Sequence, residues 1–282
     1  MQSSGARSPY LLLAHHRSGS NFLNDVLQSH PHIECINEPL SMHTRYFREC
    51  DLVPWSRSDF DRDLLHRSLA PFDELRSYLV DFKAYLQQSN RMKVIGFKET
   101  VLFGKLEWLK EFVPSLKIIL LKRDARAIIS SVLRSDLVDL WNYAGLVPPA
   151  FRRVCPGYTA RRTDHPRDVA AAELAAMSVV TRYGLAHRAL DLFEHHVLQL
   201  DELTREPERC LQLMTGFLGV DPHPEQLTFL RERQTASRGG LFSSFRAQED
   251  VENAWKQHLT PAQIEVIEDV LAAAQAKPGV ET

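Results

Sequence analysis

Residues 14–21, AHHRSGSN, place one glycine, two serines and an arginine in a pattern suited to binding an anion. They follow an apolar run, Tyr10–Ala14, and precede a helix-like pattern that begins at Ser20. Between a strand and a helix, consecutive backbone N–H groups and the helix N-terminus converge on one point, which favours a phosphate group. Arg17 adds a cation two residues before Gly19. The segment predicts a phosphate loop, and an ordinary strand–turn–helix connection is the alternative.

The spacing from Ala14 to Gly19 matches the GxxxxG of a nucleoside-triphosphate loop, but the chemistry differs. Ser20 stands where that loop has its lysine, and Asn21 stands where it has the serine or threonine that binds Mg²⁺. The loop is therefore suited to phosphate without the residues for a Mg²⁺–nucleoside triphosphate. The position of Arg17 suits an anion carried at the 5′ end of a nucleotide.

A second candidate anion site lies in residues 123–131, RDARAIISS. Arg123 directly follows the clearest strand pattern of the chain, and Ser131 comes eight residues later, roughly two helical turns into the next helix. A planar guanidinium donates two hydrogen bonds at once, which suits a terminal phosphate. In the alternative interpretation, Arg123 and Arg126 pair with Asp124 and other acids at the surface.

The two motifs together resemble the sulfotransferases that use 3′-phosphoadenosine 5′-phosphosulfate (PAPS). Residues 17–20, RSGS, match the 5′-phosphosulfate loop of that family, and residues 123–131 match its 3′-phosphate motif, with Ala125 in place of the usual proline. Residues 37–40, NEPL, are similar to a glutamate–proline element of the carbohydrate sulfotransferase branch. The sequence around Val197–Pro207 and around Trp255 is similar to C-terminal segments of the family's sequences. The likeness therefore extends over most of the chain, in the right order.

The resemblance implies PAPS as donor, PAP (3′,5′-adenosine bisphosphate) as product, and direct in-line transfer without a metal. Asn21 departs from the usual serine or threonine, although its amide can still donate to a phosphate. A late Arg–Gly pair weakly matches a further phosphate loop of the family. The donor-binding residues implied in this way are Arg17, Ser18, Gly19, Ser20, Asn21, Phe22, Arg123, Ser131, Arg238 and Gly239.

The acceptor must lose a proton, and Glu38 is the predicted general base. It follows a predicted strand end, where the acceptor should meet the donor, and a carboxylate in a partly dry pocket has a raised pKa. His15, His16 and His43 are the alternative bases. Lys98, near another strand end, is placed to stabilise the leaving group or contact the acceptor. The predicted catalytic residues are therefore Glu38, Arg17 and Lys98.

Residues 144–167 are rich in proline and arginine and predict a loop-like basic insertion beside the acceptor. Its charge favours a small-molecule or glycan acceptor that is anionic. The family branch makes a sugar hydroxyl the first expectation, and hydroxyls of lipids, peptides or polyketides stay open. The alternatives to a sulfotransferase are a P-loop nucleotide kinase or NTPase, and a non-catalytic PAP-binding or scaffold protein.

These residues need a scaffold, and short apolar runs that alternate with helical patterns supply one. The pattern predicts an α/β protein with a mostly parallel central sheet and helices on both faces, and the resemblance implies that this three-layer αβα fold is P-loop-like. Ligands of such sheets bind beyond the carboxyl ends of the strands, where both motifs lie. The predicted strands are 10–14, 33–36, 93–97, 116–121 and 197–200, and the predicted helices are 20–29, two within 59–88, 106–112, 125–134, 168–193, 207–218 and 261–274.

The composition fits one globular domain over residues 1–282. Hydrophobic residues make up 44% and charged residues 25%, and the 34 basic and 36 acidic side chains give a net charge of −2. Such a balance argues against bulk nucleic-acid binding. No stretch reaches the roughly 18 apolar residues of a membrane helix, and no signal-peptide core is present, so we expect a cytoplasmic protein without a membrane partner. The four scattered cysteines predict free buried thiols and no metal site.

Overall fold

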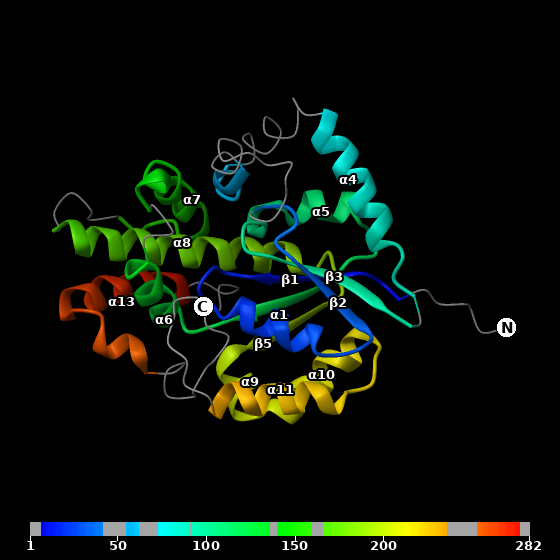
Figure 1. The fold of residues 1–282 in the computed structure, drawn as a ribbon. Helices are drawn as coiled ribbons and strands as arrows, with labels where there is room; N and C mark the ends of the chain where they lie inside the picture. The colour runs from blue at the N-terminus through cyan, green and yellow to red at the C-terminus, as the bar shows by residue number, and fades with distance from the viewer. Residues whose placement is uncertain are drawn as a thin grey trace.

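The computed structural model describes residues 7–41, 55–61, 73–90, 92–135, 140–159, 166–235 and 253–276 (Figure 1). Its centre is a five-stranded sheet in the order β2-β3-β1-β4-β5, and every pairing in it is parallel. The strands are β1 (Tyr10–Ala14), β2 (Ile33–Asn37), β3 (Val94–Glu99), β4 (Lys117–Lys122) and β5 (His195–Gln199). The predicted parallel α/β sheet is confirmed, with each strand within two residues of its expected place.

Helices cover both faces of the sheet and complete the three layers of a P-loop-like fold (Figure 1). The apolar cluster on one face includes residues of α4, α5, α6, α7, α8 and α13, with α7 and α13 packed against α8, and the cluster on the other face includes α1, α9, α10 and α11. The helices are α1 (Ser20–Gln28), α4 (Asp73–Leu86), α5 (Leu106–Phe112), α6 (Ala125–Leu133), α7 (Val147–Val154), α8 (Arg167–Leu190), α9 (Leu200–Arg205), α10 (Pro207–Leu218), α11 (Pro224–Thr235) and α13 (Pro261–Gln275), with 3₁₀ turns η1 (Phe103–Lys105), η2 (Leu140–Tyr143) and η3 (Ala254–Gln257).

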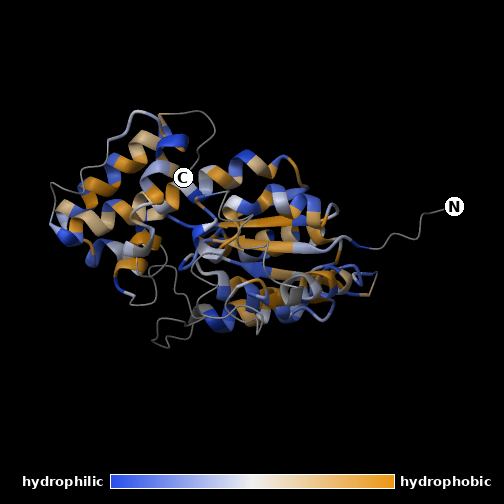
Figure 2. Cartoon of the chain, turned by 90° about the horizontal axis from the view of Figure 1, so that it is seen from above, coloured by the Kyte–Doolittle hydropathy of each residue, from blue (hydrophilic) through white to orange (hydrophobic). Residues whose placement is uncertain are grey.

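The central strand β1 is buried on both faces, and all five of its residues have no exposed surface. Leu11 and Leu13 join the apolar cluster on the α8 face, while Tyr10 and Leu12 join the cluster on the α1 face. Burying a leucine side chain contributes roughly 1.5–3 kcal/mol, so this strand is a rigid base for the loop that follows it. Figure 2 shows the same pattern, with strongly apolar strands between amphipathic helices.

Residues 147–154 form helix α7, so the prediction of a loop throughout residues 144–167 is wrong for this part. Pro148 and Pro149 lie at the start of the helix, where the backbone N–H that proline lacks has no intrahelical partner. Prolines here begin a helix instead of breaking one. Phe151 is buried in the cluster that α7 shares with α8, while Arg152 is exposed.

Helix α8 crosses the molecule on the face of the sheet opposite α1 (Figure 1). Its N-cap is Pro166 with no side-chain cap, and Asp168, where the helix was predicted to begin, lies within its first turn. Among the described residues, α8 is the one helix long and apolar enough to cross a membrane, but 89% of its most apolar 18-residue window is buried inside the protein. Its apolar surface is therefore used in the core.

Two further expectations meet the structure only in part. Cys35, Cys155 and Cys210 are free and buried as predicted, whereas Cys50 lies outside the described residues. Helix α11 was not expected, because its sequence is mostly polar and only scattered apolar residues face the core. The first predicted helix within 59–88 falls largely on undescribed residues, and the second corresponds to α4.

The Tyr10 side chain of β1 crosses β3 at Gly96 and bonds to β2. Its hydroxyl donates to the backbone carbonyl of Glu34 in β2, at 3.1 Å, although β3 lies between β1 and β2. The ring therefore passes over Gly96, its partner in β3. A methyl group added to Gly96 would lie 2.3 Å from ring carbons of Tyr10. Glycine at this position is required by the close approach of the ring.

We expect Gly96→Ala to lower the free energy of unfolding by about 1–3 kcal/mol, because the ring must shift within a packed core. Urea denaturation measures this change. Gly216→Ala in α10 is the matched control, since a methyl group there meets nothing within 4 Å and alanine favours a helix. An equal loss in both variants would show that the Tyr10 ring does not cause the requirement.

Candidate functional site

The carboxyl edge of the sheet brings the predicted residues together. Arg17 lies in the β1–α1 loop (residues 15–19), Glu38 directly follows β2, Lys98 is near the end of β3, and Arg123 directly follows β4. Ser131 reaches the same edge from α6. Open parallel sheets bind their ligands at this edge, close to the strand where the connections change direction. Here that strand is β1, between β3 and β4.

The β1–α1 loop has an unusual backbone conformation. Arg17 has φ of 68° and Gly19 has φ of 92°, both in the left-handed region. The loop is closed by the carbonyl of His15, which accepts bonds from the Ser18 backbone N–H at 3.1 Å and from its hydroxyl at 2.6 Å. A left-handed residue within a tight turn directs successive N–H groups to one side, forming a concavity for an anion. The N-terminus of α1 begins directly after it, at Ser20.

Arg17 joins the two motifs that the sequence placed in separate sites. Its Nε donates to the hydroxyl of Ser131 at 2.9 Å, although the two residues are 114 positions apart. Arg123 approaches from β4, and its Nη1 donates to the backbone carbonyl of Arg17 at 3.0 Å. These two bonds hold the left-handed turn between β1, β4 and α6. The two predicted anion motifs therefore form one continuous site.

In the alternative interpretation of this motif, both arginines pair with acids at the surface, and Arg126 does so. It contacts Asp124 at 3.1 Å and the two carboxylate oxygens of Glu268 in α13 at 2.5 and 3.0 Å. Its guanidinium also lies 5.5 Å from the ring centre of Trp255. Asp124 caps α6 by accepting from the backbone N–H groups of residues 126 and 127. The two arginines of the motif therefore differ, because only Arg123 turns toward the β1–α1 loop.

Lys98 connects the start of α1 with the predicted base. Its side chain is 1% exposed, and its ammonium group lies 2.7 Å from Asn21 Oδ1 and 2.8 Å from Glu38 Oε1. An ammonium group only donates, so the amide oxygen of Asn21 faces Lys98 and its NH₂ group points away from it. This contact makes Asn21 part of the site although its side chain departs from the family pattern. Glu38 keeps 14% of its side chain exposed and so stays open to a ligand.

Glu38 begins a tight turn with a left-handed backbone. Its φ is 47°, and its N–H donates to the carbonyl of Lys98 at 2.9 Å. Arg17 and Glu38 are the only non-glycine residues with positive φ in the described part of the chain. Such conformations cost about 1–3 kcal/mol each and are found where the surrounding structure enforces them, often at ligand sites. Both strained residues belong to the predicted site.

The turn after Glu38 is held by Glu99, a residue the sequence analysis missed. Its carboxyl oxygens accept from the Leu40 N–H at 2.6 Å and from the Ser41 hydroxyl at 2.7 Å. Glu99 has no exposed surface, and burial raises its pKa to about 8, with a smaller upward effect from Glu38. Its place directly after Lys98, at the end of a buried strand, was the available signal.

A second missed residue is Arg134 at the C-terminus of α6. Burial and the nearby Arg134 together lower the pKa of Arg17 from its ordinary value. Arg134 lies three residues after Ser131, and this helical spacing could have identified it. The positive charges gathered at this edge make it attractive for an anion with more than one negative charge.

The histidines of the loop are poor candidates for the base. His15 is 1% exposed, and burial lowers its pKa to about 3, with a contribution from Arg182. Burial also lowers the pKa of His16 well below its ordinary value, with contributions from His15 and Arg182. Both rings therefore lack the proton affinity expected of a base near neutral pH. The third alternative, His43, lies outside the described residues.

Some predicted donor contacts differ from expectation or fall on undescribed residues. The Phe22 side chain is 1% exposed and packs in the apolar cluster beneath α1, so it does not line the site as a side chain. Helical periodicity turns that position toward the sheet, which leaves its backbone N–H in the first turn of α1. Arg238 and Gly239 lie outside the described residues.

The arrangement as a whole suits transfer of a charged group from an anionic donor. The β1–α1 loop, Arg123 and Ser131 provide donors and positive charge, while the Glu38 carboxylate lies across Lys98 from the start of α1. One ammonium group thus links a carboxylate to the start of α1, and in-line transfer to a hydroxyl needs groups of these two kinds close together.

Solved structures with a similar fold are sulfotransferases. The sulfotransferase domain from the curacin biosynthetic pathway matches with TM-score 0.52 and 16% identity, over 94% of this chain and 98% of that one. Mouse sulfotransferase SULT7A1, solved in complex with PAP, matches with TM-score 0.53 and 13% identity, over 96% and 85%. The sulfotransferase domain of the Synechococcus PCC 7002 olefin synthase matches with TM-score 0.50 and 18% identity, over 96% and 97%. These likenesses show the fold.

The family assignment rests on the sequence. No curated protein matches the chain. The model of the sulfotransferase family, however, matches residues 9–225, from the start of β1 to the start of α11. This range is well over half of the chain and contains Arg17, Glu38, Lys98, Arg123 and Ser131. The chain therefore belongs to the sulfotransferase family.

Proposed function

We propose that this sulfotransferase moves the sulfuryl group of PAPS to a hydroxyl or amine acceptor, giving PAP and a sulfated product. The observation that carries the proposal is the double linkage of Arg17, to Ser131 at 2.9 Å and to Arg123 at 3.0 Å. It unites the loop suited to a 5′-phosphosulfate with the motif suited to a 3′-phosphate. A donor with phosphate groups at both ends fits these two halves better than ATP, which has no 3′-phosphate.

On the donor side, each residue has a separate role. The N–H groups of the β1–α1 loop and the first turn of α1 hold the 5′-phosphosulfate, together with Arg17. Arg123 and Ser131 hold the 3′-phosphate. Negative charge grows on the bridging oxygen as its bond to sulfur breaks, and Lys98, 2.7 Å from Asn21 at the start of α1, is placed to stabilise it. No step needs a metal ion in this scheme.

On the acceptor side, Glu38 takes the proton. The acceptor oxygen attacks sulfur and forms the new S–O bond while the bond from sulfur to the phosphate oxygen breaks, and the acceptor proton passes to the Glu38 carboxylate. The ion pair of 2.8 Å with Lys98 holds that carboxylate toward the donor site. The bonds that Glu99 accepts from Leu40 and Ser41 hold the turn that follows Glu38, and so they hold the backbone that carries this carboxylate.

For the acceptor we propose a sugar hydroxyl on an anionic glycan or small molecule. The support is the glutamate–proline turn at Glu38 and the basic character of residues 144–167. Arg152 and Arg153 are exposed at the end of α7, where their charge is available to solvent. Neutralising both together is expected to raise the acceptor KM and to leave the affinity for PAP unchanged.

Two other functions are weaker. A nucleotide kinase or NTPase needs the lysine and the Mg²⁺ ligand that Ser20 and Asn21 replace. A non-catalytic PAP-binding protein would not need the strained Glu38 or its ion pair with Lys98. Transfer of label from PAPS to any acceptor of a broad panel separates these functions, because neither alternative sulfates a product.

We expect Glu38→Gln to lower kcat for sulfuryl transfer by about 10²–10⁴-fold, because glutamine keeps the bond to Lys98 but cannot accept a proton. PAP formation from PAPS, measured with the acceptor panel and with EDTA present, gives kcat. Affinity for PAP should stay within about threefold of wild type by the same argument.

Glu111→Gln, a neutral substitution at an exposed position of α5, is the control and should keep full activity. Full activity of Glu38→Gln would exclude Glu38 as the base. Absence of sulfated product from wild type with every acceptor, despite tight PAP binding, would favour the non-catalytic alternative.

The raised pKa of Glu99 leads to a separate prediction about how the stability of the protein depends on pH. Its pKa is raised from 4.5 to about 8 in the folded protein, so its contribution to stability is fully present below pH 4.5 and is lost as pH rises to about 8. The loss is about 1.4 kcal/mol for each pH unit in that window. Glutamine can still accept from Leu40 and can donate to Ser41 without carrying a charge. We therefore expect Glu99→Gln to be more stable than wild type by about 2–4 kcal/mol at pH 8 and similar to it at pH 4.5.

Urea denaturation of both proteins at several pH values between 4.5 and 9 measures this difference. Glu111→Gln, which replaces an exposed side chain of α5, is the control and should follow the wild-type curve. A Glu99→Gln protein that is less stable than wild type at pH 8 would show that the ionised carboxylate is required in the fold.

A further inference from the structure

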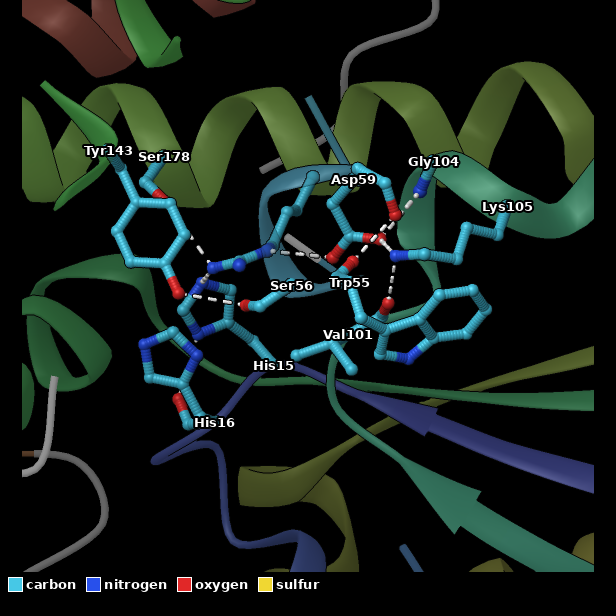
Figure 3. Close-up of polar contacts among 12 residues, drawn as sticks. His15, His16, Trp55, Ser56, Asp59, Val101, Gly104, Lys105, Tyr143 and Ser178 are labelled. Carbon is cyan, nitrogen blue, oxygen red and sulfur yellow. Dashed lines mark hydrogen bonds and ion pairs between the residues drawn. The ribbon is translucent and has the colours of Figure 1, made fainter. Parts of the chain in front are cut away.

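A buried cluster of charges lies between the start of the β1–α1 loop and α8 (Figure 3). Its one carboxylate, Asp59, is fully buried and accepts from the Lys105 ammonium at 2.7 Å and from the Gly104 N–H at 3.3 Å. Lys105 also donates to the carbonyl of Val101 at 2.5 Å and lies 4.7 Å from the ring centre of Trp55. Charges this deep in a protein are costly unless each finds partners, so the arrangement of the cluster is tightly determined.

Arg182 of α8 connects this cluster to the loop. The side chain is 3% exposed, and its Nε donates to the second oxygen of Asp59 at 3.3 Å. Its Nη1 lies 3.3 Å from His15 Nε2 and 3.3 Å from the hydroxyl of Ser178. The guanidinium also lies 4.8 Å from the ring centre of Phe60. One side chain therefore spans from the buried carboxylate to the first residue of the β1–α1 loop.

The contacts determine the form of the His15 ring. Its Nδ1 lies 2.7 Å from the backbone carbonyl of His16, which only accepts, so Nδ1 carries a hydrogen. Arg182 only donates, so Nε2 must accept and carries none. His15 is thus a neutral ring with one defined tautomer. Burial and Arg182 lower its pKa to about 3, which agrees with this form.

The backbone of His15 connects the fixed ring to the turn of the β1–α1 loop. Its carbonyl accepts the two bonds from Ser18 that close the turn. Arg17, in its left-handed conformation, lies between His15 and Ser18 in the chain. The ring bonds to the carbonyl of His16 on one side and to Arg182 on the other, so both ends of the ring are held. A change at Arg182 would remove the link from α8, and the turn would then be held by the bonds of Ser18 to His15, of Arg17 to Ser131 and of Arg123 to Arg17.

We propose that Arg182 is a positioning residue for the β1–α1 loop, acting through the neutral His15 ring to hold the turn in the shape that binds the donor. Its link to donor affinity rests on the proposed function, whereas its effect on the ring and the turn does not. Lys105 pairs with the same carboxylate but does not bond to His15. It therefore stabilises the buried cluster without holding the β1–α1 loop.

Two pairs of variants separate positioning from simple stability. Arg182→Met and Lys105→Met each remove one buried cation from Asp59, and only the first removes the partner of His15. His15→Phe and His15→Gln both keep Arg182, but only glutamine supplies an atom, its amide oxygen, that can accept from Arg182 in place of His15 Nε2. Arg188→Met, at an exposed position of α8, controls for loss of charge from that helix.

The first readout is nitrogen NMR of the histidine rings between pH 5 and 8, which reports tautomer and protonation without any ligand. We expect wild type, Lys105→Met and Arg188→Met to show one His15 tautomer, protonated at Nδ1 and constant with pH. Arg182→Met should show a mixture of tautomers or a titrating ring, with faster hydrogen exchange of the Ser18 amide. An unchanged ring and unchanged exchange in Arg182→Met would overturn the proposal.

The second readout is affinity for PAP. Arg182→Met and His15→Phe are expected to weaken it by 10-fold or more, with Lys105→Met and His15→Gln closer to wild type at a comparable loss of thermal stability. If Arg182→Met does not fold, the two His15 variants carry the test, and equal PAP affinity in them would contradict the proposal. If wild type binds no PAP, the proposed donor is wrong, and the NMR result still decides whether Arg182 positions the loop.

Discussion

The left-handed turn at Arg17 is the constraint on which the rest of the site depends. Such a backbone conformation is unfavourable for an arginine by about 1–3 kcal/mol, so the fold must hold it. It does so from four directions: β4 through Arg123, α6 through Ser131, the closing bonds of Ser18 to His15, and α8 through Arg182. Distant parts of the chain thus converge on one turn, and the buried strand β1 supplies its rigid base.

Charge is arranged around this turn in two layers. The inner layer consists of ion pairs, with the buried Asp59 between Lys105 and Arg182, and the partly exposed Glu38 paired with the buried Lys98. The outer layer lies at the sheet edge, includes Arg17 and is positive. Burial and the nearby Arg134 together lower the pKa of Arg17. Buried pairs of this kind add little net stability, because desolvation offsets the attraction. Their value here is to give one geometry to the groups that face a ligand.

The sequence allowed much of this to be predicted, for identifiable reasons. Short apolar runs marked all five strands, and parallel strands must end at one edge, so the residues that follow β1, β2 and β4 were expected together. Helix α7 was missed because its two prolines resemble a loop signal, although they stand at a helix start. The bonds of Glu99 and Arg182 depend on segments far apart in the chain, which local patterns do not reveal.

The central claim is that one continuous site binds a nucleotide with phosphate groups at its 5′ and 3′ positions. A thermal-unfolding titration with PAP and ATP, with and without Mg²⁺, tests it most directly on wild type, Arg123→Ala and the matched Arg126→Ala. We expect PAP to stabilise wild type and Arg126→Ala without Mg²⁺, by about 2.7 kcal/mol at 100 times Kd. ATP should have little effect, and Arg123→Ala should lose most of the response to PAP. A response to ATP that requires Mg²⁺, or none to PAP, would contradict the account.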